Sequence, residues 1–385
     1  MITLPTSDFE GMTVAEFDTR TLLAHASQQA RQRQYEKLFI VDVDCHHYES
    51  AAMNDIITFI EEPVMRQMAQ SAAGGGARTS GVLPSSIGYQ DQSGRVTRYP
   101  LRPHEKTPKD KERDVVLTTR WMDSMGVDMA MLFPTPMLQL SFHPLVEMQV
   151  ALARAYNRWL VERVLAVEPR IRTLLYLPLH DPEASYKMIE EFGDKPGVSG
   201  FVVVATHDVP VHANVLMKVY AALEERNLPI AFHAHFNWRD SMFKQFNRFL
   251  SAHALGFTFY NMVHLTNWVI NGIPERFPKL KTIWMESGLA WIPFMMQRLD
   301  NEYLMRSNEC PLLTKKPSDY MRDFFYSSQP MEVGDDLETL KNTFRLINAD
   351  TQLMYSSDYP HWDFDLPSTI YDLPFLTEQG RKNIL

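Results

Sequence analysis

The chain has 385 residues, of which 45% are hydrophobic and 22% are charged, an ordinary globular balance that excludes disorder along the whole chain. Its 47 acidic residues outnumber its 38 lysines and arginines, and the formal charge of -9 argues against a broad phosphate-binding surface, so we expect no nucleic-acid partner. No apolar run approaches the ~20 residues that span a bilayer, and two cysteines cannot form a disulfide framework, so we expect a cytoplasmic protein without a membrane partner.

Residues 1–37 are polar and rich in glutamine and arginine, and we interpret them as an N-terminal extension. A helix is predicted from about Thr19 to Leu38, although its apolar positions are sparse. Nothing in the composition decides whether this helix packs on the main domain or on a second subunit.

Eight short runs rich in apolar, β-branched and aromatic residues follow, and stretches with helical spacing, such as residues 147–166, separate most of them. We predict strands at residues 38–44, 127–133, 171–179, 198–205, 228–235, 280–287, 323–329 and 351–358. Eight strands that alternate with helices are typical of a parallel (β/α)8 TIM barrel, an α/β fold. An open doubly wound sheet is the alternative, but the G-x-G-x-x-G turn of that fold does not follow the first strand.

Residues 45–127, between the first two predicted strands, are too numerous for a simple connection. The segment would lie on the face where barrels carry their active sites. We therefore interpret it as a lid or an oligomerisation loop of a barrel that spans residues 38–385. Its Arg95, Arg98 and Arg102 could hold a substrate carboxylate, although arginines on an exposed loop are more often solvated.

Acidic and imidazole side chains stand at the carboxyl ends of four predicted strands, where barrels place their catalytic groups. They are Asp44 and His46 on the first strand, His233 and His235 on the fifth, Glu286 on the sixth, and Asp358 with His361 on the eighth. Residues two apart in a strand share a face, so each pair can converge on one ion. Carboxylate and imidazole ligands suit Zn, Mn or Fe. His47 is expected to point away from His46, and Glu49 is more simply explained as a helix cap.

Four segments resemble the amidohydrolase-related family of metal-dependent barrels: IVDVDCHHYE, IAFHAH, FPKLKTIWMESGLAWIPFMMQRLD and LMYSSDYPHWDFD. That family includes aminocarboxymuconate semialdehyde decarboxylase, resorcylate and carboxyvanillate decarboxylases, and related hydrolases. The resemblance runs from about residue 38 to the C-terminus, except for most of residues 50–125. It implies a divalent metal that activates water or polarises a substrate carbonyl or carboxylate.

Transferred position by position, the resemblance implies that one divalent ion is bound by Asp44, His46, His233 and Asp358. Asp358 would also take a proton, and Glu286 stands where the decarboxylases carry a histidine, which argues against simple decarboxylation. The other candidate catalytic residues are His235 and His264, although core packing is the slightly simpler explanation for His264 in its predicted helix. The predicted function is hydrolysis or C–C lyase chemistry on a small carboxylate or amide.

Two alternatives stay open, because the strand ends carry more candidate ligands than one ion uses. The segments SSQPMEV and SDYPHWDFDLP resemble the branch that contains 2-aminoisobutyrate hydroxylase, which implies a binuclear Fe or Mn/Fe oxygenase of aliphatic C–H bonds with a homologous partner subunit. In that case His235, Glu286 and His361 are the candidate ligands of the second ion. The last alternative is a non-catalytic partner subunit. We expect a homo-oligomer, or a hetero-oligomer with a homologous subunit.

Overall fold

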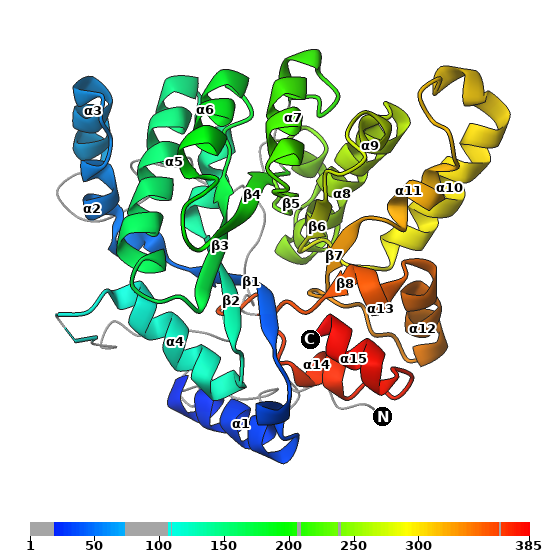
Figure 1. The fold of residues 1–385 in the computed structure, drawn as a ribbon, viewed down its shortest axis with the longest axis horizontal. Helices are drawn as coiled ribbons and strands as arrows, with labels where there is room; N and C mark the ends of the chain where they lie inside the picture. Colours follow the sequence, from blue (N-terminus) through cyan, green and yellow to red (C-terminus); the bar gives the residue numbers. More distant parts are fainter. Residues whose placement is uncertain (1–18, 74–106, 109, 206–208, 238–239, 362) are drawn as a thin grey trace.

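The computed structural model describes residues 19–73, 107–108, 110–205, 209–237, 240–361 and 363–385. Eight parallel strands form one sheet in chain order (Figure 1). The strands are β1 Val41–His47, β2 Met129–Pro134, β3 Ile171–Tyr176, β4 Val198–Val204, β5 Ile230–His233, β6 Thr282–Met285, β7 Phe325–Ser327 and β8 Leu353–Met354. Each overlaps one of the eight predicted runs, so the predicted (β/α)8 barrel is confirmed.

Hydrogen bonds between β1 and the segment that begins at β8 bring the two edges of the sheet together. The Val43 amide donates to the Tyr355 carbonyl at 3.0 Å, and the Asp358 amide donates to the Asp44 carbonyl at 2.7 Å. The C-terminus reinforces this seam, because the Val41 amide donates to the Leu385 carbonyl at 2.7 Å. The carboxyl ends of the first and last strands are therefore held side by side.

Helices surround the strands, as Figure 1 shows. They are α1 Thr19–Gln32, α2 Met53–Thr58, α3 Pro63–Ala73, α4 Arg113–Met125, α5 Val146–Leu160, α6 Pro182–Phe192, α7 Met217–Glu225, α8 Phe249–Ile270, α9 Ile273–Arg276, α10 Trp291–Arg306, α11 Pro317–Met321, α12 Leu337–Leu346, α13 Ala349–Gln352, α14 Ser368–Tyr371 and α15 Glu378–Ile384. Two short 3₁₀ segments near the site are η3 Glu49–Ala51 and η5 Pro136–Phe142. Among the described helices, none has both the length and the hydropathy needed to cross a bilayer.

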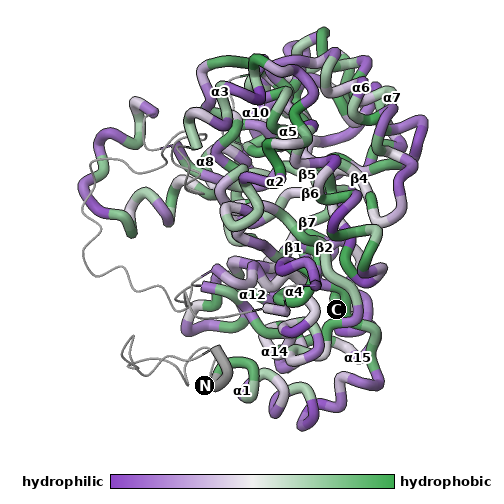
Figure 2. Tube along the Cα trace, turned by 90° about the vertical axis from the view of Figure 1, so that its left-hand side faces the viewer, coloured by the Kyte–Doolittle hydropathy of each residue, from purple (hydrophilic) through white to green (hydrophobic). Residues whose placement is uncertain are grey.

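The strands are apolar on both faces because the barrel interior covers one face and the helices cover the other. Inside the barrel, five side chains from β2 to β6 form one buried cluster: Phe133, Leu174, Val202, Ala231 and Met285. The larger core lies between the strands and the helices. Figure 2 shows helices such as α5 with both hydrophobic and hydrophilic residues along their length, as expected where one face packs inward.

The predicted extension and insertion are only partly within the described residues. Helix α1 lies inside the predicted Thr19–Leu38 helix and packs against α4. The insertion contributes α2, α3 and α4, but residues 74–106, including Arg95, Arg98 and Arg102, lie outside the described part. Its interpretation as a lid or an oligomerisation loop therefore stays a prediction.

Candidate metal centre

Three strand ends bring two carboxylates and two imidazoles together at one end of the barrel. Asp44 and His46 come from β1, His233 ends β5, and Asp358 follows β8. The His46 Nε2 atom lies 3.4 Å from Asp44 Oδ1, 3.2 Å from Asp358 Oδ1 and 3.3 Å from His233 Nε2. The ligand atoms of Asp44, His46 and His233 all lie within 4.8 Å of one another. The structure thus places the four predicted ligands in one cluster.

Backbone carbonyls orient both imidazoles of this cluster. His46 Nδ1 lies 3.0 Å from the Pro134 carbonyl, and His233 Nδ1 lies 2.8 Å from the Ala234 carbonyl. A carbonyl only accepts, so each Nδ1 carries a hydrogen and each Nε2 faces the cluster, where its lone pair is available to an ion once that nitrogen is unprotonated. Metal-binding histidines are usually held in this way, with the second ring nitrogen donating to the protein.

The two carboxylates of the cluster are buried and face imidazoles rather than backbone amides. Asp44 and Asp358 are each 1% exposed, and the polar groups that face their oxygens among the described residues are the imidazole nitrogens of His46, His233 and His361 rather than backbone amides. Burial of an unpaired carboxylate is costly, so such groups are normally paired or bound to metal. Two carboxylates and two Nε2 lone pairs form a donor set that fits one divalent Zn, Mn or Fe ion.

Electrostatics within the cluster favour a cation. Burial works against ionisation of Asp44, but His233 and His46 hold the pKa of its carboxyl well below the usual range. Burial lowers the pKa of His46, yet the carboxylates of Asp358 and Asp44 raise this pKa to about 10. Without a metal, the cluster therefore retains a proton on His46, and metal binding would release that proton.

The backbone around the site adopts an uncommon conformation at two acidic residues. Glu286 and Asp358 have φ values of 52° and 57°, in the left-handed region that residues other than glycine rarely occupy. The Glu286 amide donates to Ser327 Oγ at 2.9 Å, and the Ser357 amide donates to Asp42 Oδ1 at 2.9 Å. Such conformations cluster at functional sites, where the surrounding structure enforces them.

Glu286 and His361 extend the cluster beyond the four predicted ligands. Glu286 Oε2 lies 3.3 Å from His233 Nδ1, and His361 Nδ1 lies 2.8 Å from Asp358 Oδ1. His46, Asp358 and His361 form a second group of potential ligands within 4.8 Å of one another. Burial, together with the carboxylates of Asp358 and Asp44, raises the pKa of Glu286 well above its ordinary value.

His235 lies beside the cluster between two aromatic rings. Its imidazole stacks on Phe142 with ring centroids 5.8 Å apart and meets the edge of Phe236 at 5.4 Å. Its Nε2 atom is buried and has no hydrogen-bond partner within the part of the chain that the structure describes. Burial, with smaller contributions from the other histidines, lowers the pKa of His235 to about 3, so the ring is neutral.

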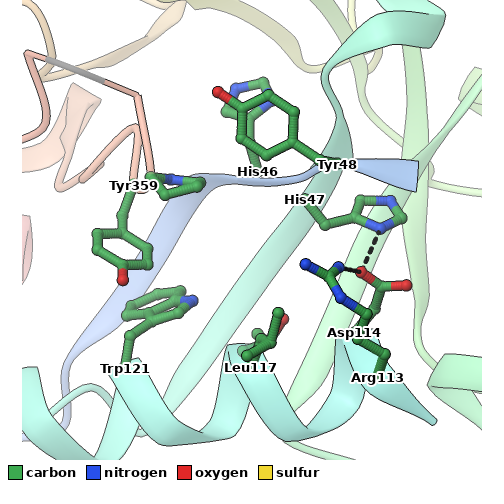
Figure 3. A pocket seen from close by; sticks show the side chains of 10 residues that line it. His46, His47, Tyr48, Arg113, Asp114, Leu117, Trp121 and Tyr359 are labelled. Carbon is green, nitrogen blue, oxygen red and sulfur yellow. Dashed lines mark hydrogen bonds and ion pairs between the residues drawn. The ribbon is translucent and has the colours of Figure 1, made fainter. Parts of the chain in front are cut away.

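Two further histidines are placed away from the cluster. His264 lies on α8, and its Nε2 contacts the Ala205 carbonyl just after β4, while its ring stacks on Phe232 at 6.1 Å. His47 leaves β1 in a different direction from His46 and faces Asp114 on α4, as Figure 3 shows. Both are therefore packed between barrel strands and outer helices.

The sequence reasoning missed Thr135, which follows β2 directly. Its hydroxyl lies 3.1 Å from His361 Nε2. The only sequence signal was its position, a polar residue at the carboxyl end of a predicted strand.

Three solved structures of other proteins align with most of this chain. A 5-carboxyvanillate decarboxylase from Sphingomonas paucimobilis aligns with a TM-score of 0.62 at 21% identity, covering 90% of this chain and 96% of that one. A 2,6-dihydroxybenzoate decarboxylase, solved with 2,6-dihydroxybenzoate, aligns with a TM-score of 0.62 at 18% identity and the same coverage. A dihydroxybenzoic acid decarboxylase from Polaromonas sp. JS666, solved with manganese and 2-nitroresorcinol, aligns with a TM-score of 0.61 at 18% identity, covering 90% and 94%.

At these identities the solved structures establish the fold. The family is established by sequence, because the pattern of the amidohydrolases matches residues 43–385. This match includes all four residues of the cluster and the whole barrel apart from the start of β1. The chain belongs to the amidohydrolase family.

Proposed function

We propose that this chain is a divalent-metal-dependent enzyme that acts on a small carboxylate or amide by hydrolysis or by C–C bond cleavage. The observation that carries the proposal is the buried cluster of Asp44, His46, His233 and Asp358, in which imidazole nitrogens rather than backbone amides face the carboxylate oxygens. Membership of the amidohydrolase family supports the reaction class. The similar decarboxylase structures support the lyase branch of that class.

The donor set suits Mn, Zn or Fe, and one of the similar structures contains manganese. A bound ion of this kind would polarise a substrate carbonyl or carboxylate, or lower the pKa of a water molecule. His46 and His233 would contribute Nε2, and Asp44 and Asp358 would contribute carboxylate oxygens. These four side chains already face one another, so they can form the donor set without any backbone carbonyl.

Three side chains are suited to the substrate and its protons. Asp358 is held ionised, since His361 and His46 lower the pKa of its carboxyl against the effect of burial, so it can accept a proton. Burial and the neighbouring carboxylates raise the pKa of Glu286 well above its ordinary value, which favours the protonated form that can donate a proton. The unpartnered Nε2 of neutral His235 is placed to orient a polar substrate group beside the flat ring of Phe142. His264 contributes packing in this proposal.

Elemental analysis of protein purified without chelator, with and without oxygen, tests the proposal. We expect about one equivalent of Mn, Zn or Fe per chain. His46→Ala should abolish binding because it removes the imidazole at the centre of the cluster. His143→Ala is the matched control, since His143 is only half-buried and follows η5 directly, outside both groups of potential ligands. A His46→Ala variant that keeps its full metal content would refute the assignment.

A binuclear Fe or Mn/Fe oxygenase is the second candidate. The observation that favours it is the second group of potential ligands, in which His361 joins His46 and Asp358, with Glu286 close by. Two metal equivalents per chain that include iron would support this candidate over the hydrolase or lyase. The search would then turn to a homologous partner subunit and an electron donor.

We also propose that the protein works in the cytoplasm as a homo-oligomer or with a homologous subunit. Light scattering on the purified chain measures the mass of the assembly directly. A metal-free chain that binds its partner fully would instead favour a non-catalytic subunit.

A further inference from the structure

We propose that Glu49 and Thr135 are positioning residues that hold the His361 imidazole in the orientation and tautomer required beside Asp358. This inference rests on the metal centre proposed above, because Asp358 is one of its ligands. Neither Glu49 nor Thr135 touches that cluster through a described contact with Asp44, His46 or His233. They act through His361.

The first step is the contact between Glu49 and the segment after β2. Glu49 begins η3, separated from the end of β1 by one residue, and its side chain is fully buried. Its Oε2 accepts from the Thr135 amide at 3.1 Å, and its Oε1 accepts from the Met137 amide at 2.6 Å. Both carboxylate oxygens are therefore engaged with the start of η5, which explains why this buried acid is not free to bind an ion.

The second step runs from the fixed backbone of Thr135 to its side chain. The Thr135 amide also donates to the His47 carbonyl at 3.1 Å, so this residue is attached to the β1 end at two points. Its Oγ1 atom lies 3.1 Å from His361 Nε2. The carboxylate of Glu49 thus determines where the hydroxyl that contacts His361 is located.

The third step is the orientation of the His361 ring. This ring stacks on His46, with centroids 4.2 Å apart and an angle of 28° between the planes. Its Nδ1 atom lies 2.8 Å from Asp358 Oδ1, while Nε2 faces Thr135 at the opposite edge. Both ring nitrogens are therefore engaged by the protein.

These contacts select one tautomer of neutral His361. A carboxylate oxygen at 2.8 Å is an acceptor, so the ring hydrogen belongs on Nδ1 and the lone pair on Nε2. Only a donor can satisfy Nε2, and the hydroxyl of Thr135 supplies it. Without that hydroxyl, Nε2 would lose its donor, and only the contact with Asp358 and the stack on His46 would hold this tautomer and ring orientation.

Thr135→Val tests the proposal, because valine keeps the shape of threonine and removes the hydroxyl. The protein is labelled with ¹⁵N-histidine, and the ring nitrogens of His361 are observed by NMR in the metal-free and the zinc-loaded protein. The His361 resonances are assigned as those that disappear in the His361→Asn variant. We expect the Nε2 resonance to shift in Thr135→Val. Zinc affinity should fall by about ten-fold, as is typical when a residue outside the coordination sphere that orients a metal site is lost. Thr135→Ser should restore both. Thr343→Val is the matched control, since its buried hydroxyl donates to the Thr339 carbonyl within α12.

A double-mutant cycle tests whether Glu49 acts through Thr135. We expect Glu49→Gln alone to weaken zinc binding, and the double variant with Thr135→Val to bind zinc no more weakly than the weaker single variant. Unchanged ring resonances in Thr135→Val, or unchanged zinc affinity, would overturn the proposal. If Glu49→Gln does not fold, the Thr135 variants decide the outcome. A wild-type chain that binds no metal refutes the metal centre, whereas the metal-free ring resonances still test the tautomer.

Discussion

The burial of Glu49 predicts a specific pH dependence of stability that Glu49→Gln should remove. Burial is the main cause that raises the pKa of this carboxyl to about 7, from 4.5 in an unrestrained chain. A carboxyl with a raised folded pKa binds its proton more tightly in the folded state than in the unfolded state. Its contribution to stability is therefore full below about pH 4.5 and is lost as the pH rises through about 7.

The magnitude follows from this difference in pKa. At 1.36 kcal/mol per pKa unit, the contribution falls by about 2.5 kcal/mol between pH 5 and pH 8. Glutamine is uncharged at both pH values and nearly equal in size, so Glu49→Gln lacks this decline. The free energy of unfolding of the wild type relative to Glu49→Gln should therefore decrease by about that amount from pH 5 to pH 8.

Urea denaturation of both proteins at several pH values, with a chelator to exclude stabilisation by metal, measures this difference. Taking the difference between the two proteins cancels the other titrating groups that they share. Parallel stability curves for the wild type and Glu49→Gln would refute the reasoning, since they would mean that burial does not hold the proton on Glu49.

Three further predictions concern the metal, the substrate side and the core. Asp358→Ala should reduce the metal content from about one equivalent per chain towards zero by elemental analysis, because it removes one of two carboxylate ligands; full occupancy would contradict its role. His235→Phe should keep its full metal content, because His235 Nε2 lies outside the group of ligand atoms formed by Asp44, His46 and His233. A loss of metal in this variant would identify His235 as a ligand instead. Leu152→Ala on α5 should lower the free energy of unfolding by about 2–5 kcal/mol in urea, since Leu152 is fully buried, and a change near zero would contradict its packing.

The barrel could be predicted because its strands depend on a strong local signal. A buried parallel strand is apolar on both faces, so a segment such as residues 198–205 is recognisable without knowledge of its neighbours. The last strand was less well predicted. A run from 351 to 358 was expected, but β8 ends at Met354, and the chain beyond it contacts β1 through Tyr355 and Asp358. Those contacts depend on barrel closure, which no local pattern describes.

The candidate ligands could be predicted from the sequence because strand ends converge in a barrel. The residues that orient these ligands could not be predicted in the same way. Thr135 matters only because the β2 end lies beside the residues after β8, and its partner His361 is 226 positions away in the chain. The left-handed backbone conformation of Asp358 also depends on contacts between distant parts of the chain. Its backbone amide bonds the Asp44 carbonyl, a contact between the two ends of the barrel.

Four buried acids on β1, just after β1 or after β8 divide into two kinds by the groups that face their carboxylate oxygens. Asp42 accepts from the backbone amides of Asp44 and Ser357 through Oδ1, and Glu49 accepts from the amides of Thr135 and Met137, so backbone amides face both acids. Asp44 and Asp358 receive no such hydrogen bond from the described residues, and imidazoles surround them instead. All four are acids near a strand end, so the sequence alone could not distinguish them. Because a fold tolerates unsatisfied buried carboxylates only where another group neutralises them, the missing amides favour Asp44 and Asp358 over Asp42 and Glu49 as the pair that would bind the proposed ion.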